Sequence, residues 1–125
     1  MSPNKSKTSV VILAAGDGKR MKTGIPKVMN MVRNEPLVSH VVKSVAESKL
    51  GVRPIVVVAP THTLVQDYLG DRAVYAVQDQ QLGTGHAVGC AESLWRDSET
   101  VVVLYGDMPF ITSTSIDRLV AEHQA

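Results

Sequence analysis

The chain has 125 residues, of which 44% are hydrophobic and 20% are charged, and this is the size and composition of one globular domain. Its formal net charge of +1 gives no reason to expect a nucleic acid or an anionic membrane as partner. One cysteine, Cys90, excludes a disulfide framework within the chain and fits a reducing compartment. No apolar stretch approaches the roughly 18 residues that span a bilayer. We therefore expect a cytoplasmic protein in which residues 1–8 are a disordered tail and residues 9–125 fold.

Apolar runs alternate with segments of helical spacing along the chain. The apolar runs predict short strands at 10–13, 55–59, 74–77 and 101–105, and the wholly apolar run at 10–13 is typical of a buried parallel strand. The helical spacing predicts helices at 36–48, 63–69, 85–94 and 114–123. We expect Gly51 to cap the first of these helices in a left-handed conformation, and Thr114 with Asp117 to cap the last.

Strands that alternate with helices imply crossover connections and a parallel sheet, so we predict an α/β fold. Sheets of this kind bind ligands beyond the carboxyl ends of their strands. The loop after Leu13 and the segment Tyr105-Gly106-Asp107 both follow predicted strands. We therefore expect these two segments to share one edge of the sheet and to form a site there.

The first of these segments is a small-residue loop followed by cations. A loop without bulky side chains lets backbone N–H groups approach a phosphate closely. Arg20 could pair with phosphate oxygens through its forked guanidinium, and Lys27 could act as a mobile point charge. The loop matches neither the dinucleotide fingerprint nor a Walker A loop, and a simple turn with solvated cations is the alternative. The segment reads Leu13-Ala14-Ala15-Gly16-Asp17-Gly18-Lys19-Arg20-Met21, and Lys22 and Pro26-Lys27 follow it.

A second segment, residues 78–87, leads from the third predicted strand into a helix. The amide of Gln78 can both donate and accept, which suits the edge of a nucleotide base. Gly83 and Gly85 allow a planar ring to come close, and Thr84 is expected to cap the helix. The neighbouring His86 sits at the start of a helix, where a histidine is more often structural.

The third segment ends the last predicted strand and carries a carboxylate. Asp107 follows Gly106 directly, and a carboxylate in this position is a frequent ligand for Mg²⁺ that bridges to phosphates. Mg²⁺ keeps several waters and uses phosphate oxygens, so one carboxylate can suffice. The alternative is a turn aspartate before Pro109.

The order of these segments resembles the sugar nucleotidyltransferase family. The resemblance rests on Leu13 to Met21, Pro26-Lys27-Val28, Gln81 to Ala87 and Leu104 to Pro109, and it covers nearly the whole chain. The run Gln81-Leu82-Gly83-Thr84-Gly85-His86-Ala87 is similar to the uridyltransferase domains of the bifunctional uridyltransferase/acetyltransferase enzymes of amino-sugar metabolism. The fold this implies is Rossmann-like, a mostly parallel sheet with helices on both faces. The reaction it implies joins UTP and N-acetylglucosamine 1-phosphate to give UDP-N-acetylglucosamine and pyrophosphate.

The resemblance also implies roles for individual residues. Leu13, Ala14, Ala15 and Gly16 would contact the uridine and the start of the phosphate chain. Arg20 and Lys27 would stabilise the triphosphate and the departing pyrophosphate as the catalytic cations. Gln78, Gly83 and Thr84 would read the uracil. Tyr105, Gly106 and Asp107 would hold the ribose side, with Asp107 on Mg²⁺.

Two departures from the family bear on these expectations. Lys19 stands where the family commonly has threonine. The chain is also shorter than the family's domain, so we expect residues 9–125 to be the N-terminal, nucleotide-binding part of a truncated domain that lacks most of the sugar pocket. Alternatives are a non-catalytic fragment that binds uridine nucleotides, or an enzyme for another sugar or nucleotide. Surfaces exposed by truncation would favour self-association.

Overall fold

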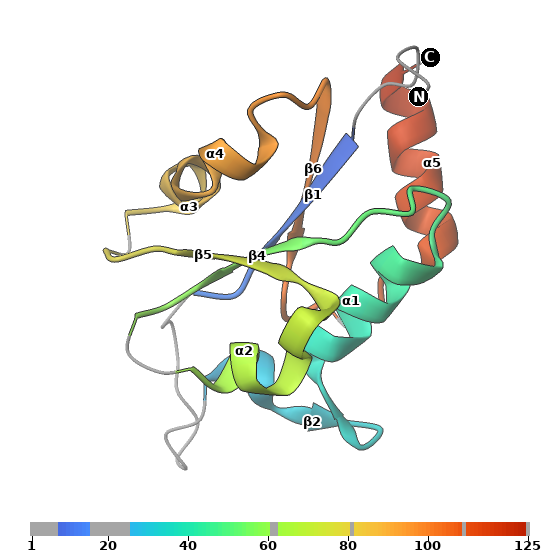
Figure 1. Ribbon diagram of the computed structural model, residues 1–125. Helices are drawn as coiled ribbons and strands as arrows, with labels where there is room; N and C mark the ends of the chain where they lie inside the picture. Colours follow the sequence, from blue (N-terminus) through green and yellow to red (C-terminus); the bar gives the residue numbers. More distant parts are fainter. Residues whose placement is uncertain (1–7, 16–25, 61–62, 81, 109, 125) are drawn as a thin grey trace.

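A four-stranded, all-parallel sheet with the order β5-β4-β1-β6 forms the centre of the computed structural model (Figure 1). The structure describes residues 8–15, 26–60, 63–80, 82–108 and 110–124. The strands are β1 (Thr8–Leu13), β4 (Ile55–Val58), β5 (Val74–Val77) and β6 (Thr100–Tyr105). All four predicted strands are present, and the predicted α/β fold is confirmed.

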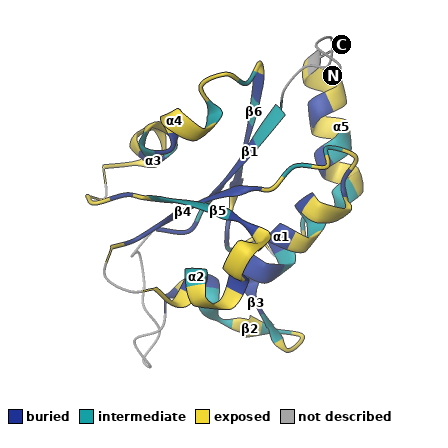
Figure 2. Ribbon diagram, in the orientation of Figure 1, coloured by how far each residue is buried: buried dark blue, intermediate teal, exposed yellow. Residues whose placement is uncertain are grey.

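Helices cover both faces of the sheet, because the side chains of each strand alternate between two cores. Val10 and Ile12 belong to the larger core, which includes side chains from α1, α2 and α5. Val11 belongs to the smaller core, which includes side chains from α3 and α4. Figure 2 shows the buried strand β4 between helices whose outer faces are exposed, while β5 is only partly buried. The helices are α1 (Leu37–Glu47), α2 (Leu64–Leu69), α3 (Thr84–Cys90), α4 (Glu92–Trp95) and α5 (Ser113–Gln124).

The strand β4 is buried along its whole length, as its apolar run predicts. Val56, Val57 and Val58 have no exposed surface, and Ile55 is 4% exposed. Residues with branched β-carbons pack well on a pleated surface covered on both faces. Burial of each of these side chains contributes roughly 1.5–3 kcal/mol, so β4 anchors the sheet that positions the site.

A short hairpin between β1 and α1 was not predicted from the sequence. The 3₁₀ turn η1 (Lys27–Met29) leads into β2 (Met31–Val32), which pairs antiparallel with β3 (Glu35–Pro36). The two residues between these strands, Arg33 and Asn34, have φ angles of 53° and 70°. Positive φ at both central positions is typical of the tight hairpin turn whose twist matches its strands.

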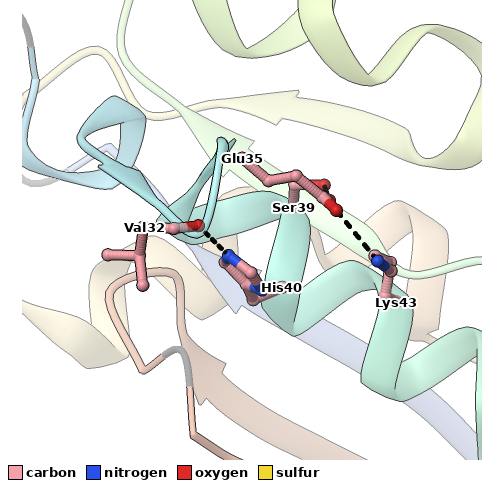
Figure 3. Close-up of polar contacts among 5 residues, drawn as sticks. All are labelled: Val32, Glu35, Ser39, His40 and Lys43. Carbon is pink, nitrogen blue, oxygen red and sulfur yellow. Dashed lines mark hydrogen bonds and ion pairs between the residues drawn. The ribbon is translucent and has the colours of Figure 1, made fainter.

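Polar contacts attach this hairpin to α1 (Figure 3). The Nε2 atom of His40 lies 2.6 Å from the carbonyl oxygen of Val32, which can only accept, so Nε2 donates. Glu35 accepts a hydrogen bond from Ser39 Oγ at 2.8 Å and one from Lys43 Nζ at 2.9 Å. The hydrogen bonds from Lys43 and then Ser39 hold the pKa of Glu35 below its ordinary value of 4.5.

The predicted helices at 36–48, 63–69 and 114–123 are found as α1, α2 and α5, but Gly51 does not cap α1. The cap is Ser48, whose backbone N–H and hydroxyl donate to the carbonyl oxygen of Val45 at 3.1 Å and 2.6 Å. Gly51 is left-handed, with a φ of 61°, but it lies beyond this cap in the connection to β4. The prediction of Gly51 as the cap was therefore wrong, because a serine ends the helix first.

The cap of α5 also differs from the prediction. The backbone N–H of Ser115 donates to Thr112 Oγ1 at 3.1 Å, so the capping side chain is Thr112 and not Thr114. Asp117 instead accepts from the backbone N–H of Lys49, at 2.9 Å and 3.2 Å to its two oxygens. Its carboxylate thus joins α5 to the end of α1, which local sequence could not indicate.

The predicted helix at 85–94 is two helices, α3 and α4, which are separated at Ala91. The backbone angles of Ala91, −101° and 9°, lie outside the α-helical range. Gly83, with a φ of 103°, is the N-cap of α3, and no side-chain hydrogen bond caps this helix. Thr84 is its first residue, so the prediction that Thr84 caps the helix was wrong.

The structure bears on two further expectations, a tail at residues 1–8 and the lack of a membrane-spanning segment. The expected tail at residues 1–8 lies outside the described residues except for Thr8, which begins β1 and pairs with Thr100. Within the described ranges, no helix combines the length and the apolar character that crossing a membrane requires.

Candidate functional site

The order of the strands changes direction at β1. From β1 the chain passes to β4 and β5 on one side, and it then crosses to place β6 on the other side of β1. Open parallel sheets bind ligands at such a point, beyond the carboxyl ends of the two strands. Leu13 and Tyr105 end β1 and β6 and are register partners, so the two predicted segments share an edge as expected.

Backbone hydrogen bonds hold these two strand ends tightly together. The N–H of Gly106 donates to the carbonyl oxygen of Leu13 at 2.9 Å, and the N–H of Ala14 donates to the carbonyl oxygen of Val57 at 2.8 Å, which joins the end of β1 to β4 as well. A Cβ atom at Gly106 would lie 3.0 Å from Val28 Cγ1 and 3.1 Å from the Leu13 oxygen. Glycine at position 106 therefore allows this close approach, and a larger residue would have to displace Val28 or Leu13.

One cation and one carboxylate meet at this edge. Lys27 Nζ lies 3.3 Å from Asp107 Oδ2, and the two side chains are 60% and 36% exposed. An ion pair this exposed contributes only about 0–1 kcal/mol to stability. Both groups are thus accessible to a ligand at little cost. Val28, the neighbour of Lys27, is buried near Gly106 and anchors η1 beside the strand ends.

The other predicted residues of this edge have different outcomes. Ala15 is 2% exposed and packs in the smaller core, whereas Tyr105 is 47% exposed at the end of β6. Gly16 and Arg20, like Lys19 and Lys22, lie outside the described residues. The structure therefore brings together the residues Leu13, Ala14, Lys27, Gly106 and Asp107.

A second group of predicted residues lies at the end of β5. Gln78 follows β5 and is 3% exposed, and its backbone N–H donates to Val58 at 2.9 Å. Its side-chain Nε2 donates to the carbonyl oxygen of Gly83 at 3.4 Å and lies 3.0 Å from His86 Nδ1. Thr84 is exposed in the first turn of α3.

The two groups lie at the same edge of the sheet, with β4 between β1 and β5. Neighbouring strands are about 4.8 Å apart, so the end of β5 lies roughly 10 Å from the end of β1 and roughly 14 Å from the end of β6. An elongated ligand with a polar ring at one end and anionic groups at the other could contact both. The contacts of Val28 and His86 were not predicted, because each depends on residues that only the fold brings near.

Asp107 is the predicted ligand for Mg²⁺, and its surroundings fit this ion. The described residues contain no group of three or more histidine, cysteine, aspartate or glutamate side chains that could form a complete metal cage. Mg²⁺ bound together with a nucleotide needs only one or two carboxylates, because phosphates and waters supply the other oxygens. An accessible carboxylate beside a lysine at the strand ends matches that requirement.

Similarity to known proteins agrees with this geometry. Residues 10–125 match the MobA-like NTP transferase domain. The chain is 45% identical over 120 residues to the bifunctional protein GlmU of Symbiobacterium thermophilum, covering 94% of this chain and 25% of that protein. It is 47% identical over 117 residues to GlmU of Exiguobacterium sp., covering 92% and 26%. The chain thus spans about a quarter of the length of these relatives.

Solved structures share the fold at lower sequence identity. A nucleotidyl transferase from Methanothermobacter superposes with a TM-score of 0.75 at 21% identity, covering 94% of this chain and 57% of that one. This likeness confirms the Rossmann-like architecture that the sequence predicts. Because the match to the domain extends over residues 10–125, the chain belongs to the MobA-like NTP transferase domain family.

Proposed function

We propose that this chain binds UTP and takes part in uridylyl transfer to N-acetylglucosamine 1-phosphate, with UDP-N-acetylglucosamine and pyrophosphate as products. Membership of the NTP transferase family supports the reaction class. The identity of 41–47% to proteins named GlmU, together with the run at 81–87, supports this choice of nucleotide and sugar.

The juxtaposition of Lys27 and Asp107 is the observation that carries this proposal. A lysine and a carboxylate 3.3 Å apart, both accessible, lie beside the ends of β1 and β6, where Ala14 and Gly106 follow the strands. Phosphates need cationic groups and close backbone approach, and a divalent cation needs an oxygen ligand. Both requirements are met where β1 and β6 end.

The proposed mechanism is in-line displacement at the α-phosphorus of UTP. An oxygen of the sugar phosphate forms a bond to this phosphorus while the bond to the oxygen of the β-phosphate breaks, and pyrophosphate leaves with that oxygen. The reaction requires positioning and charge neutralisation more than acid–base catalysis. Lys27 would neutralise charge on the phosphate chain, with Arg20 as its proposed second cation. The segment Leu13 to Gly16 would contact the uridine and the start of the phosphate chain.

When bound at Asp107, Mg²⁺ would supply electrostatic stabilisation of the phosphate oxygens. In this proposal Asp107 contributes one carboxylate oxygen, and Lys27 turns from that carboxylate toward the phosphates. Tyr105 and Gly106 would lie along the ribose. The side chain of Tyr105 is 47% exposed and is therefore accessible to a sugar ring, while Gly106 is packed against Leu13 and Val28 and would hold the end of β6 in place.

The residues at the end of β5 are the proposed reader of the base. Gln78 offers an amide held in a fixed place, Gly83 and Thr84 begin a helix with exposed backbone, and all three lie at the same sheet edge as Lys27. A uracil bound there would leave its phosphates directed toward the ends of β1 and β6.

The release of pyrophosphate by the purified chain tests the proposal. The chain is mixed with UTP, Mg²⁺ and N-acetylglucosamine 1-phosphate, and parallel reactions replace UTP with CTP, dTTP or GTP and the sugar with glucose 1-phosphate. Release that requires both UTP and the amino-sugar phosphate would support the proposal. Binding of UTP without turnover would favour a non-catalytic nucleotide-binding role, and turnover with another pair would reassign the substrates. A rise in specific activity with protein concentration would indicate self-association.

A further inference from the structure

The contact between Gln78 and His86 adds a residue to the proposed base-reading site. Gln78 is 3% exposed, and its side-chain nitrogen Nε2 lies 3.4 Å from the carbonyl oxygen of Gly83. A carbonyl oxygen can only accept, so the amide nitrogen and not the amide oxygen must face Gly83. This contact shows, without reference to the histidine, which of the two amide atoms faces Gly83.

The same nitrogen lies 3.0 Å from Nδ1 of His86. Because Nε2 of Gln78 has only hydrogens to offer, Nδ1 must accept, and the neutral imidazole then carries its proton on its own Nε2 atom. His86 is exposed in the first turns of α3, while Gln78 is buried at the end of β5. A histidine on a helix therefore orients a buried amide on the neighbouring strand end.

An amide nitrogen engaged by Gly83 and His86 leaves Oε1 as the atom of Gln78 that meets a base. An oxygen acceptor pairs with the N3–H donor of uracil, whereas cytosine has an unprotonated N3 whose lone pair would repel it. We infer that His86 is a positioning residue, which selects uracil over cytosine by holding the Gln78 amide in one orientation. This inference rests on the proposed function, because it assumes that a pyrimidine nucleotide binds at the end of β5.

The test is the ratio of CTP to UTP dissociation constants, measured by calorimetry for the wild-type chain and three variants. His86→Leu removes the acceptor and should lower the preference for UTP about tenfold, which is the effect expected of one lost hydrogen bond. His86→Asn offers Oδ1 as a replacement acceptor, so it should keep the preference. His123→Leu makes the same substitution at an exposed histidine of α5, away from β5 and α3, and as the matched control it should leave the ratio unchanged.

Rescue by His86→Asn is the second readout, because a general disturbance of the structure around position 86 would lower the preference for UTP in both His86 variants. A wild-type preference for UTP that His86→Leu does not reduce, or that His86→Asn reduces as much as His86→Leu does, would overturn the inference and leave UTP binding intact. Equal affinity for both nucleotides would overturn it as well. Failure of the wild-type chain to bind any nucleotide would instead overturn the proposed function, and this inference with it.

Discussion

Lys27 Nζ lies 3.3 Å from Asp107 Oδ2, and this pair joins the turn before the hairpin to the end of β6. Both side chains are exposed, so each could leave the ion pair and bind an atom of a ligand instead. A lysine that neutralises phosphate and a carboxylate that binds a divalent cation would separate when a metal–nucleotide complex enters. Substitutions at either residue, and in the packing around them, should therefore change nucleotide binding.

Lys27→Ala should raise the dissociation constant for Mg²⁺–UTP by roughly tenfold or more, because a charge-assisted contact to phosphate is lost. Its effect on the free energy of unfolding should stay below about 1 kcal/mol, since the ion pair is exposed. Lys43→Ala removes a similar exposed pair, with Glu35, at a distance from the strand ends and serves as the control. Equal UTP affinities for the two variants would remove Lys27 from the site.

Asp107→Asn should abolish most of the Mg²⁺ dependence of UTP binding. The substitution keeps the shape of the side chain but replaces a charged oxygen ligand with a neutral amide, which Mg²⁺ binds less well. Titrations of UTP with and without Mg²⁺ measure the difference, and Asp71→Asn in the turn before β5 is the matched control. An undiminished metal effect in Asp107→Asn would show that other residues hold the ion.

Gly106→Ala should weaken both folding and nucleotide binding. The new methyl group would lie 3.0 Å from Val28 Cγ1 and 3.1 Å from the Leu13 oxygen, so the two strand ends would have to separate. Overpacking of this kind costs about 1–3 kcal/mol, measurable by urea unfolding. At Gly89 of α3 an added methyl group meets nothing within 4 Å, so Gly89→Ala should be neutral or stabilising by about 0.5–1 kcal/mol. Identical stabilities for the two variants would contradict this account of position 106.

The contribution of Glu35 to stability should depend on pH. Hydrogen bonds from Lys43 and Ser39 lower the pKa of Glu35 in the folded chain. The carboxylate therefore stabilises the fold fully above the ordinary pKa of 4.5, and this stabilisation is lost as the pH falls below 4.5 and through the lowered pKa of the folded chain. Melting temperatures of wild type and Glu35→Gln should therefore differ at pH 7 and converge as the pH approaches 3. A constant difference over this interval would mean that the hydrogen bonds to Glu35 do not favour its charged form.

Buried strands and the residues that follow them were predictable from sequence, because they depend on local composition. The apolar runs that form β1, β4, β5 and β6 were enough to predict that Leu13, Gly106 and Asp107 share one sheet edge. The two-residue strands β2 and β3 are too short to produce a periodic pattern. In their turn, Asn34 is a residue type that tolerates the positive φ found there, whereas Arg33 is not.

Features that depend on distant residues could not be predicted. Asp117 appeared to belong to a helix cap, but its carboxylate accepts from Lys49, which lies 68 residues earlier. His86 appeared to be an ordinary residue at a helix start, although it contacts the Gln78 amide. Gly16 and Arg20 lie outside the described residues, so their roles remain predictions.

The most direct test is to locate the nucleotide by recording amide chemical shifts while Mg²⁺–UTP is added to the labelled chain. We expect the largest changes at the carboxyl ends of the strands, at Ala14, Gly106, Asp107 and Gln78. A groove of about 380 Å³ near the amino ends of β4 and β5, which Arg53 and Arg72 help to line, serves as the internal comparison. Shifts confined to that groove, with none at the ends of β1 and β6, would contradict a nucleotide site at the strand ends.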